Sequence, residues 1–249
     1  MSRLLEDKVC LVTGTSKGIG KAIAEKFAEQ GAIVIANARK EGSIDDWANE
    51  LSEKNNTDVK PYYFDVRDSG NVKKVIMDIR KQFKCLDVLV NNAGVVSYEL
   101  LGFVNTDKLK DMFEVNVVAP LQLMQLATRL MSRQNAGSII NISSLVGLKG
   151  VHGQLAYSVT KGALNTLTLS ASKELAPKQI RVNAIAPGMI GTNRLKDVMS
   201  EKFQDKIDDI GFGRLGKPEE VADVCLFLAS DLSTYVTGQI IGVDGSLDI

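Results

Sequence analysis

A tyrosine and a lysine carry the clearest candidate chemistry in this sequence. Tyr157 and Lys161 stand four positions apart at the start of a stretch with a helical pattern, Ser158–Leu175. Residues at this spacing share one face of a helix, with Cβ atoms roughly 5–6 Å apart. A cation beside a phenol favours the phenolate and so eases proton release near neutral pH, which makes Tyr157 a candidate general acid. The pair alone also fits two amphipathic side chains on a solvated helix face, so its meaning depends on the rest of the chain.

Two other polar positions could take part in the same chemistry. Ser143 and Ser144 follow an apolar run, and Ser144 precedes Tyr157 by thirteen positions. A serine hydroxyl there could hold a carbonyl oxygen while the tyrosine protonates it, although paired serines are also ordinary turn formers. Asn116 lies in the helical stretch Thr106–Ser132, where an amide has no propensity advantage. It is either exposed or holds a water molecule in the site.

A glycine-rich turn follows the first apolar run and predicts a phosphate-binding loop. It reads Thr13-Gly14-Thr15-Ser16-Lys17-Gly18-Ile19-Gly20. Glycines allow a tight turn in which backbone amides approach a pyrophosphate, and the following helix N-terminus favours its charge. The spacing differs from G-x-G-x-x-G, and a plain strand–helix turn remains an alternative. No Gly-Lys-Ser/Thr ending is present, which disfavours a nucleotide hydrolase of the P-loop class.

The ends of the next runs indicate which dinucleotide binds. Arg39 and Lys40 follow the second run, where an NAD site would place a carboxylate for the adenosine ribose. Together with Lys17 in the glycine turn, these cations favour NADPH over NADH by roughly ten- to a hundredfold, the value of one charge-assisted hydrogen bond. The alternative is that Arg39 and Lys40 are solvated loop charges. Asp65, followed by Val66, could accept a hydrogen bond from the adenine amino group or cap the next helix.

The run Asn91-Asn92-Ala93-Gly94 offers room for a flat ring and amides that tie loops together, or is a simple Asn-Gly turn.

These residues need a scaffold that brings strand ends together, and the apolar pattern predicts one. Most of the apolar runs are continuous, as in a parallel sheet covered on both faces. Helical patterns separate them, among them Lys21–Gln30, with Ile23 and Phe27 on one side. This alternation predicts a single α/β domain with a Rossmann-type, doubly wound, parallel seven-stranded sheet, whose ligands sit beyond the carboxyl ends of the strands. We expect a dinucleotide-binding part at about 1–140 and a catalytic and substrate part at about 141–249. The seven expected strands are Val9–Thr13, Ile33–Asn37, Val59–Asp65, Val88–Asn91, Ile139–Ile142, Val182–Ile185 and Ile240–Val243.

Composition narrows the class of protein further. The 249 residues are 45% hydrophobic and 24% charged, and 30 Lys and Arg balance 30 Asp and Glu, so nothing indicates a nucleic-acid or membrane-surface partner. The N-terminus has no apolar signal core, and no run approaches the length of a membrane span. Three scattered cysteines and one histidine make a disulfide framework or a metal site improbable. We expect a cytoplasmic protein.

In combination, the motifs resemble the short-chain dehydrogenase/reductase family over nearly the whole chain. The motifs are Thr13-Gly14-x-x-x-Gly18-Ile19-Gly20, Asn91-Asn92-Ala93-Gly94, Asn116, Ser144, Tyr157-x-x-x-Lys161 and Pro187-Gly188, with Gly213–Ala222 and Gly238–Gly245 near the end. The resemblance implies hydride transfer from a nicotinamide to a ketone, coupled to protonation by Tyr157. It implies that Ser144 polarises the carbonyl, that Lys161 holds the nicotinamide ribose and favours the tyrosinate, and that Asn116 anchors a proton-relaying water. It also places Thr192 on the nicotinamide carboxamide and Ile190 beside the ring. The implied cofactor site comprises Gly14, Ser16, Lys17, Gly18, Ile19, Gly20, Arg39, Asp65, Val66, Asn92, Ala93, Gly94, Tyr157, Lys161, Pro187, Gly188, Ile190 and Thr192.

Within the family the chain is most similar in kind to 3-oxoacyl-[acyl-carrier-protein] reductases, which implies a 3-oxoacyl thioester substrate. Those enzymes recruit an acidic carrier protein through basic residues, but the corresponding positions here hold Asn135 and Lys178, with Arg133 nearby. The substitutions weaken bidentate phosphate recognition and put carrier-protein binding in doubt. A dehydrogenase of alcohols, sugars, steroids or secondary metabolites is the alternative. A non-catalytic dinucleotide-binding regulator would not require the four polar site residues together.

The substrate site and the assembly are the remaining expectations. Leu145–Ala156 and the segment 191–211 should line the substrate site, the second as a lid that carries Arg194, Leu195, Val198, Met199 and Phe203. His152 is expected at the rim. The resemblance implies a homotetramer whose dimer interface uses the helices of Asn116 and of Tyr157. The stripe of Leu164, Leu167, Ala171 and Leu175 fits that interface or an intramolecular core.

Overall fold

The computed structural model describes residues 3–192 and 207–249 and contains a sheet of seven parallel strands. The strand order is β3-β2-β1-β4-β5-β6-β7, so the direction of winding reverses between β1 and β4. Every strand pair is parallel, as predicted. The strands are β1 (Val9–Val12), β2 (Ile33–Ala38), β3 (Val59–Tyr63), β4 (Val88–Asn91), β5 (Gly137–Ile142), β6 (Ile180–Pro187) and β7 (Ile240–Val243).

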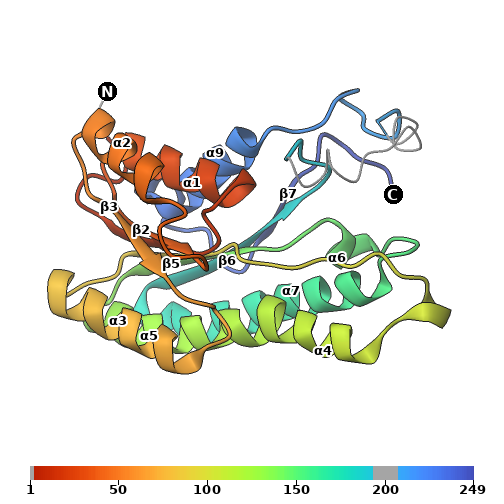
Figure 1. The fold of residues 1–249 in the computed structure, drawn as a ribbon, viewed down its shortest axis with the longest axis horizontal. Helices are drawn as coiled ribbons and strands as arrows, with labels where there is room; N and C mark the ends of the chain where they lie inside the picture. Colours follow the sequence, from red (N-terminus) through yellow and green to blue (C-terminus); the bar gives the residue numbers. More distant parts are fainter. Residues whose placement is uncertain (1–2, 193–206) are drawn as a thin grey trace.

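Two layers of helices cover the sheet, one on each face (Figure 1). One layer contains α1, α2 and α9, and the other contains α3, α5 and α7. Each layer buries its own apolar cluster, around Phe27 on the first face and around Leu123 on the second. Burial on both faces is the reason that the strands are continuous apolar runs. The helices are α1 (Gly18–Glu29), α2 (Asp45–Asn55), α3 (Ser69–Phe83), α4 (Thr106–Phe113), α5 (Ala119–Gln134), α6 (Val146–Lys149), α7 (Leu155–Leu175) and α9 (Pro218–Ala229).

The predicted strands are all present, and the differences are at their ends. The largest is β6, which runs for eight residues and adds two residues at each end of the predicted Val182–Ile185. At its C-terminal end this extension carries Pro187 to the sheet edge, next to Val243 of β7. Proline is tolerated at a strand end because no ladder hydrogen bond from its nitrogen is needed there.

The predicted helix Thr106–Ser132 is interrupted. Asn105 caps the first segment, because its Oδ1 accepts hydrogen bonds from the backbone N–H groups of Asp107 and Lys108 at 3.0 Å each. A π-helical segment, Glu114–Val118, then joins α4 to α5. π-Helical segments shift the helix register and are frequent at functional sites. The segment contains Asn116, the buried amide singled out from the sequence.

The apolar stripe of α7 faces inward. Leu164 is 1% exposed, and Leu167, Ala171 and Leu175 pack against the apolar cluster under the sheet. Of the two interpretations of this stripe, the structure supports the intramolecular core, since the same side chains hold α7 to the sheet. The exposed large apolar side chains of this layer are different ones: Met77 on α3, Leu121 on α5, and Leu155, Val159 and Leu169 on α7.

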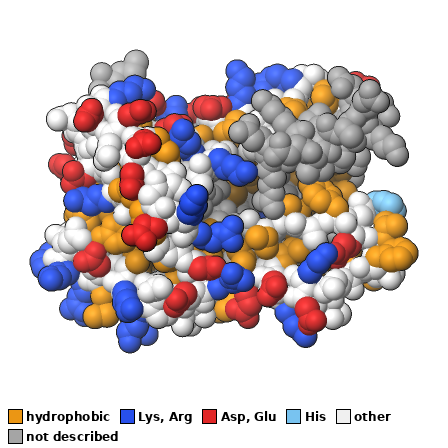
Figure 2. Space-filling view, in the orientation of Figure 1, with side chains coloured by type: hydrophobic (Ala, Val, Ile, Leu, Met, Phe, Trp, Pro, Cys, Tyr) orange, Lys and Arg blue, Asp and Glu red, His pale blue; other side chains and the backbone are white. Residues whose placement is uncertain are grey.

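The outer surface has no dominant charge on the face shown in Figure 2, where Lys and Arg alternate with Asp and Glu. Within residues 3–192 and 207–249, no helix is both long and apolar enough to span a bilayer.

Candidate functional site

A cavity of about 630 Å³ opens at the carboxyl ends of the strands, across the point where the winding reverses. All of the predicted cofactor-binding residues line it, and so does Ser144. They come from the loops after six strands: Gly14 to Gly20 after β1, Arg39 after β2, Asp65 and Val66 after β3, Asn92 to Gly94 after β4, Ser144 after β5, and Gly188, Ile190 and Thr192 after β6. Tyr157 and Lys161 reach the cavity from α7. Asn116 and Lys40 do not line it.

The glycine turn leaves no space for side chains. A Cβ atom on Gly20 would lie 2.3 Å from both Asn92 Nδ2 and the Gly14 carbonyl oxygen. Gly14 has a φ of +71°, and a Cβ there would lie 3.0 Å from the Cα atom of Ala93. Backbone therefore comes close to both glycines, and the first residues of α1, Gly18 to Gly20, line the cavity. A pyrophosphate at a helix N-terminus needs backbone that is free of side chains in this way, and binding of a phosphate by this turn stays a prediction.

Two side chains to which the sequence analysis gave no role, those of Thr13 and Asn37, hold this turn. Thr13 Oγ1 accepts hydrogen bonds from the backbone N–H groups of Asn92 and Ala93 at 2.9 and 3.0 Å. Asn37 Oδ1 accepts one from Gly14 N at 3.2 Å, and its Nδ2 donates to Phe64 O at 3.0 Å. Both side chains are buried. A polar residue at the end of an otherwise apolar strand is the signal that could have identified them.

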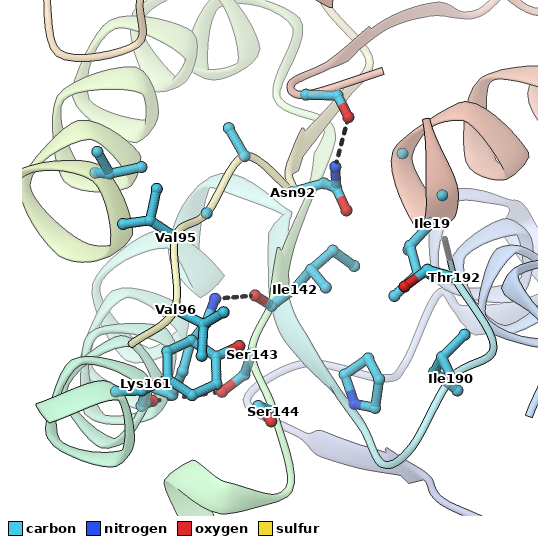
Figure 3. A pocket seen from close by; sticks show the side chains of 18 of the residues that line it. Ile19, Asn92, Val95, Val96, Ile142, Ser143, Ser144, Lys161, Ile190 and Thr192 are labelled. Atoms are coloured by element: carbon cyan, nitrogen blue, oxygen red, sulfur yellow. Dashed lines mark hydrogen bonds between the residues drawn. The ribbon is translucent and has the colours of Figure 1, made fainter. Parts of the chain in front are cut away.

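Asn92 confirms the expectation that amides tie the loops together. Its Nδ2 donates to the carbonyl oxygens of Thr13 and Gly14 at 2.8 and 3.0 Å. Figure 3 shows Asn92 making one of these bonds. Asn91 instead bonds within the sheet, to Asn141 Oδ1 of β5 at 2.9 Å. The Asn-Gly run therefore fixes the β1 and β4 loops as one rigid edge of the cavity.

At the other end of the cavity, α7 presents its lysine and tyrosine together. Lys161 is 3% exposed, and its Nζ donates to Ile142 O at 2.7 Å (Figure 3). The same Nζ lies 5.7 Å from the centroid of the Tyr157 ring. A Cβ on Gly147 would lie 2.7 Å from Lys161 Cβ, so the segment after β5 must be free of a side chain there for α7 to approach. The half-buried Ser144 lines the cavity from that same segment.

Asn116 lies one layer behind this group. It is 1% exposed; its Nδ2 donates to Val95 O at 2.9 Å and Thr160 Oγ1 at 3.0 Å, and its Oδ1 accepts from Val95 N at 2.9 Å. Of the two alternatives for Asn116, an exposed position is therefore excluded. A Cβ on Gly94 would lie 3.3 Å from Asn116 Oδ1 and 3.6 Å from Lys161 Nζ, so the three residues converge. The role of Asn116 in holding a water molecule stays a prediction.

The third region of the cavity is charged. Lys17, Arg39, Asp65 and Arg67 line it. Arg67 pairs with Asp65, Nη2 to Oδ2, at 2.7 Å, and this hydrogen bond is the main reason that the pKa of Asp65 lies below its usual range. Arg39 adds to that lowering through its charge. Asp65 does not cap the following helix, since Asp68 does so by accepting from Asn71 N at 3.0 Å. Arg67 was not predicted, although it follows the singled-out pair Asp65-Val66 directly.

The substrate end is mostly apolar. Of the predicted segment Leu145–Ala156, the residues Leu145, Val146, Val151 and Gln154 line the cavity. Asp209, within the predicted segment 191–211, also lines the cavity. Additional lining residues, not predicted, are Val95, Val96, Tyr98, Val115, Ser143, Met189, Leu247 and Ile249. The predicted lid residues Arg194, Leu195, Val198, Met199 and Phe203 lie outside the described residues. His152 is exposed and lines a smaller neighbouring hollow that shares Tyr98, Val151 and Gln154 with the main cavity.

The two halves of the chain meet across the cavity. A Cβ on Gly18 would lie 3.2 Å from Thr192 Cγ2, so the loop after β6 reaches the glycine turn. Figure 3 shows Thr192 beside Ile19, with Ile190 further along the same loop. A Cβ on Gly188 would lie 2.8 Å from Asp244 Cβ, which makes a side chain at this turn incompatible with the segment after β7.

Comparison with known proteins gives matches over nearly the full chain. A family model described as Enoyl-(Acyl carrier protein) reductase matches residues 14–247. The 3-oxoacyl-[acyl-carrier-protein] reductase FabG of Thermotoga maritima is 42% identical over 245 residues, which are 98% of this chain and 99% of that protein. A 3alpha-hydroxysteroid dehydrogenase of Mediterraneibacter gnavus is 35% identical over 99% of both chains.

Solved structures agree with the whole architecture. YwfH, described as an NADPH-dependent reductase involved in bacilysin biosynthesis, superposes with a TM-score of 0.93 at 29% identity, covering 98% of this chain and 99% of that one. L-sorbose reductase from Gluconobacter frateurii, solved with NADPH and L-sorbose, also has a TM-score of 0.93, at 31% identity over 99% of this chain and 98% of that one.

Proposed function

Because the chain belongs to the short-chain dehydrogenase/reductase family, we propose that it reduces the ketone of a 3-oxoacyl thioester to a secondary alcohol with NADPH. The observation that carries this proposal is the convergence of Ser144, Tyr157 and Lys161 on one cavity with the glycine turn. The similarity to FabG from Thermotoga maritima supports the substrate class.

In this proposal the cavity would hold the dinucleotide along its length. The glycine turn, with Ser16 and Lys17, would hold the pyrophosphate at the N-terminus of α1. Lys17 and Arg39 would hold the ribose phosphate, and Asp65 and Val66 the adenine. Ala93, Gly94, Pro187, Gly188, Ile190 and Thr192 would enclose the nicotinamide, whose ribose Lys161 would hold. NADPH supplies the hydride when it is bound.

The protein's contribution to the reaction is orientation and a proton. The Ser144 hydroxyl would donate a hydrogen bond to the carbonyl oxygen and hold it beside Tyr157. The Tyr157 hydroxyl would give its proton to that oxygen as the hydride reaches the carbon. Lys161, fixed by the Ile142 carbonyl, would stabilise the tyrosinate that results. Asn116 would anchor a water molecule through which solvent returns the proton.

The test measures the decrease in NADPH absorbance with each compound in a panel of carbonyl substrates. We expect oxidation of NADPH with acetoacetyl thioesters, and slower oxidation with small cyclic ketones and with ketoses. Turnover of the ketones without turnover of the thioesters would contradict the substrate class and leave the reaction class intact. Fluorescence of bound NADPH with no turnover of any carbonyl compound would indicate a regulator instead.

A dehydrogenase of small alcohols, sugars or steroids is the second candidate. Two positions favour it, since Asn135 and Lys178 stand where carrier-recruiting reductases place basic residues for an acidic partner, and only one of the two retains a charge. The similarity to a 3alpha-hydroxysteroid dehydrogenase supports it too. Faster turnover of a free thioester than of the same acyl group on a carrier protein would favour a reductase that does not dock the carrier.

We further propose a cytoplasmic homotetramer in which about residues 1–140 bind the dinucleotide and about 141–249 supply the catalytic and substrate groups. The support for assembly is the layer of α5 and α7, which leaves Leu121, Val159 and Leu169 exposed by 38%, 49% and 40%. Burial of such side chains against a second copy would stabilise a dimer.

A further inference from the structure

Arg67 holds Asp65 with most of its donor groups. The pair lies in the loop between β3 and α3, and both side chains line the cavity. Asp65 Oδ1 accepts from Arg67 N at 2.9 Å and from Arg67 Nε at 3.1 Å. Asp65 Oδ2 accepts from Arg67 Nη2 at 2.7 Å, with Nε at 3.2 Å. A planar guanidinium bonded in this forked way fixes both the position and the rotation of a carboxylate.

The pairing leaves one acceptor site on the carboxylate. Each carboxylate oxygen offers about two lone-pair sites. Arg67 N and Nε occupy those of Oδ1, whereas Oδ2 has one strong partner in Nη2 and retains a second site. Asp65 is therefore an ionised, oriented acceptor at the wall of the cavity, able to take one further N–H donor. An exocyclic amino group supplies such a donor, and a carbonyl oxygen in its place would be repelled.

The other cations at this end of the cavity are distributed differently. Lys17 is in the glycine turn and Arg39 follows β2, whereas Arg67 sits after β3, close enough to Asp111 and Glu114 of the α4 region to feel their charge. Acidic residues on that side oppose the approach of a phosphate to Arg67. A ribose phosphate is better placed at Lys17 and Arg39, which leaves Arg67 to act through Asp65.

We propose that Arg67 is a positioning residue that orients Asp65 toward the amino group of the cofactor's adenine, and that it thereby sets the preference for adenine over a base that lacks this group. The proposal rests on the NADPH site proposed above. It adds that the base is recognised through an ion pair within a single loop.

The test compares NADPH with the NADPH analogue that carries hypoxanthine in place of adenine. Dissociation constants of both are measured by nicotinamide fluorescence for the wild type, Arg67→Ala, Arg67→Lys and Asp65→Asn. We expect the wild type to prefer NADPH roughly ten- to a hundredfold, the value of one hydrogen bond to a charged group. In Arg67→Ala that preference should fall to about threefold or less, because NADPH binds more weakly while the analogue changes by less than about twofold. Arg67→Lys, which keeps a charge but not the fork, should lie between the two.

Three results would overturn the proposal. Equal weakening of both cofactors in Arg67→Ala would mean that Arg67 contacts a part that they share, such as a phosphate, or supports the loop as a whole. An unchanged preference in that variant would mean that Asp65 needs no positioning, and a wild type without any preference would mean that the amino group is not recognised. Arg80→Ala, which removes an exposed arginine of α3 outside the cavity, is the matched control and should leave both constants unchanged. The titration needs no carbonyl substrate. Its result can therefore be interpreted even if the proposed substrate class is wrong.

Discussion

One turn of α7 sets the distance between Tyr157 and Lys161, which we propose to act as a pair. The buried ammonium is itself held by the Ile142 carbonyl, so its position does not depend on the cofactor. Such a fixed charge next to a phenol is what a proton donor near neutral pH requires. The proposed chemistry therefore depends on a few individual atoms. Two single substitutions test this, one at Tyr157 and one at Gly20.

Replacing Tyr157 by Phe removes the proposed proton donor and leaves the ring in place. We expect kcat to fall by about 100-fold or more, the usual scale for a general acid, with little change in the dissociation constant for NADPH. Steady-state kinetics with the best substrate of the panel measures the first quantity and fluorescence titration the second. Tyr235→Phe, at a fully exposed position, is the control. Near-normal turnover of the Tyr157 variant would assign the proton transfer to another group.

Gly20→Ala tests the close approach in the glycine turn. The added methyl would lie 2.3 Å from Asn92 Nδ2 and from the Gly14 carbonyl oxygen, so one of the two loops must move. We expect destabilisation of about 1–3 kcal/mol, the usual cost of overpacking, and a weaker affinity for NADPH. Gly102→Ala is the matched control, because a Cβ there meets nothing within 4 Å. Equal thermal denaturation midpoints for the two variants would refute the steric argument.

At the scale of elements, the loops after β1 and β4 behave as one unit. Thr13 Oγ1 accepts hydrogen bonds from two backbone N–H groups of the β4 loop, and Asn92 Nδ2 donates two hydrogen bonds to carbonyl oxygens of the β1 loop. Both loops come from adjacent strands of a parallel sheet, whose carboxyl ends meet at one edge. The cofactor groove thus has a wall that is rigid before any ligand binds, which lowers the entropic cost of binding.

Thr13→Val removes the shared acceptor at nearly constant volume. The N–H groups of Asn92 and Ala93 then lose a buried partner, and leaving such groups unsatisfied costs about 1–3 kcal/mol. Chemical denaturation should show this loss, and NADPH affinity should fall with it. Thr166→Val, which removes an exposed hydroxyl from α7, should change stability by less than about 0.5 kcal/mol. A Thr13 variant as stable as the Thr166 control would mean that the loops do not depend on this hydroxyl.

At the scale of the whole molecule, the sheet separates two apolar clusters, and the outer face of the α5 and α7 layer remains uncovered in a single copy. Leu169→Glu places a charge on that face. If the face joins two copies, burial of an unpaired carboxylate is costly and the variant should sediment as a smaller species than the wild type. Met77→Glu, on the exposed side of α3, should leave the sedimentation coefficient unchanged. An unchanged assembly of the Leu169 variant would exclude this face.

The clusters also protect the thiols. Burial raises the pKa of Cys10 and Cys225, and to a lesser degree that of Cys85, which is only half-buried. Because the thiolate is the reactive form, we expect a thiol reagent to modify the native protein at Cys85 first and at the other two cysteines only after unfolding. Kinetics of modification with Cys85→Ser as the control would show whether the fast phase disappears. Fast modification of all three thiols in the native protein would contradict the burial.

The sequence by itself determined the class of fold and most of the cavity's wall, but little of its apolar substrate end. Continuous apolar runs can be stable only with both faces covered, and parallel strands place the residues that follow them at one edge, so Gly14, Arg39, Asp65, Asn92 and Ser144 were predicted together. Tyr157 and Lys161 were predicted because helical spacing is a local property.

Tertiary structure alone decided the contacts between segments that are far apart in sequence. Nothing local reveals that Asn37 holds Gly14, that Asn116 bonds to Val95 behind the cavity, or that the stripe of α7 faces the sheet rather than a partner. An apolar or amide side chain carries no information about which neighbour covers it, since that depends on how the layers pack. Arg67 could not be predicted for the same reason. Its proposed role depends on the cavity that it lines as well as on its ion pair with Asp65.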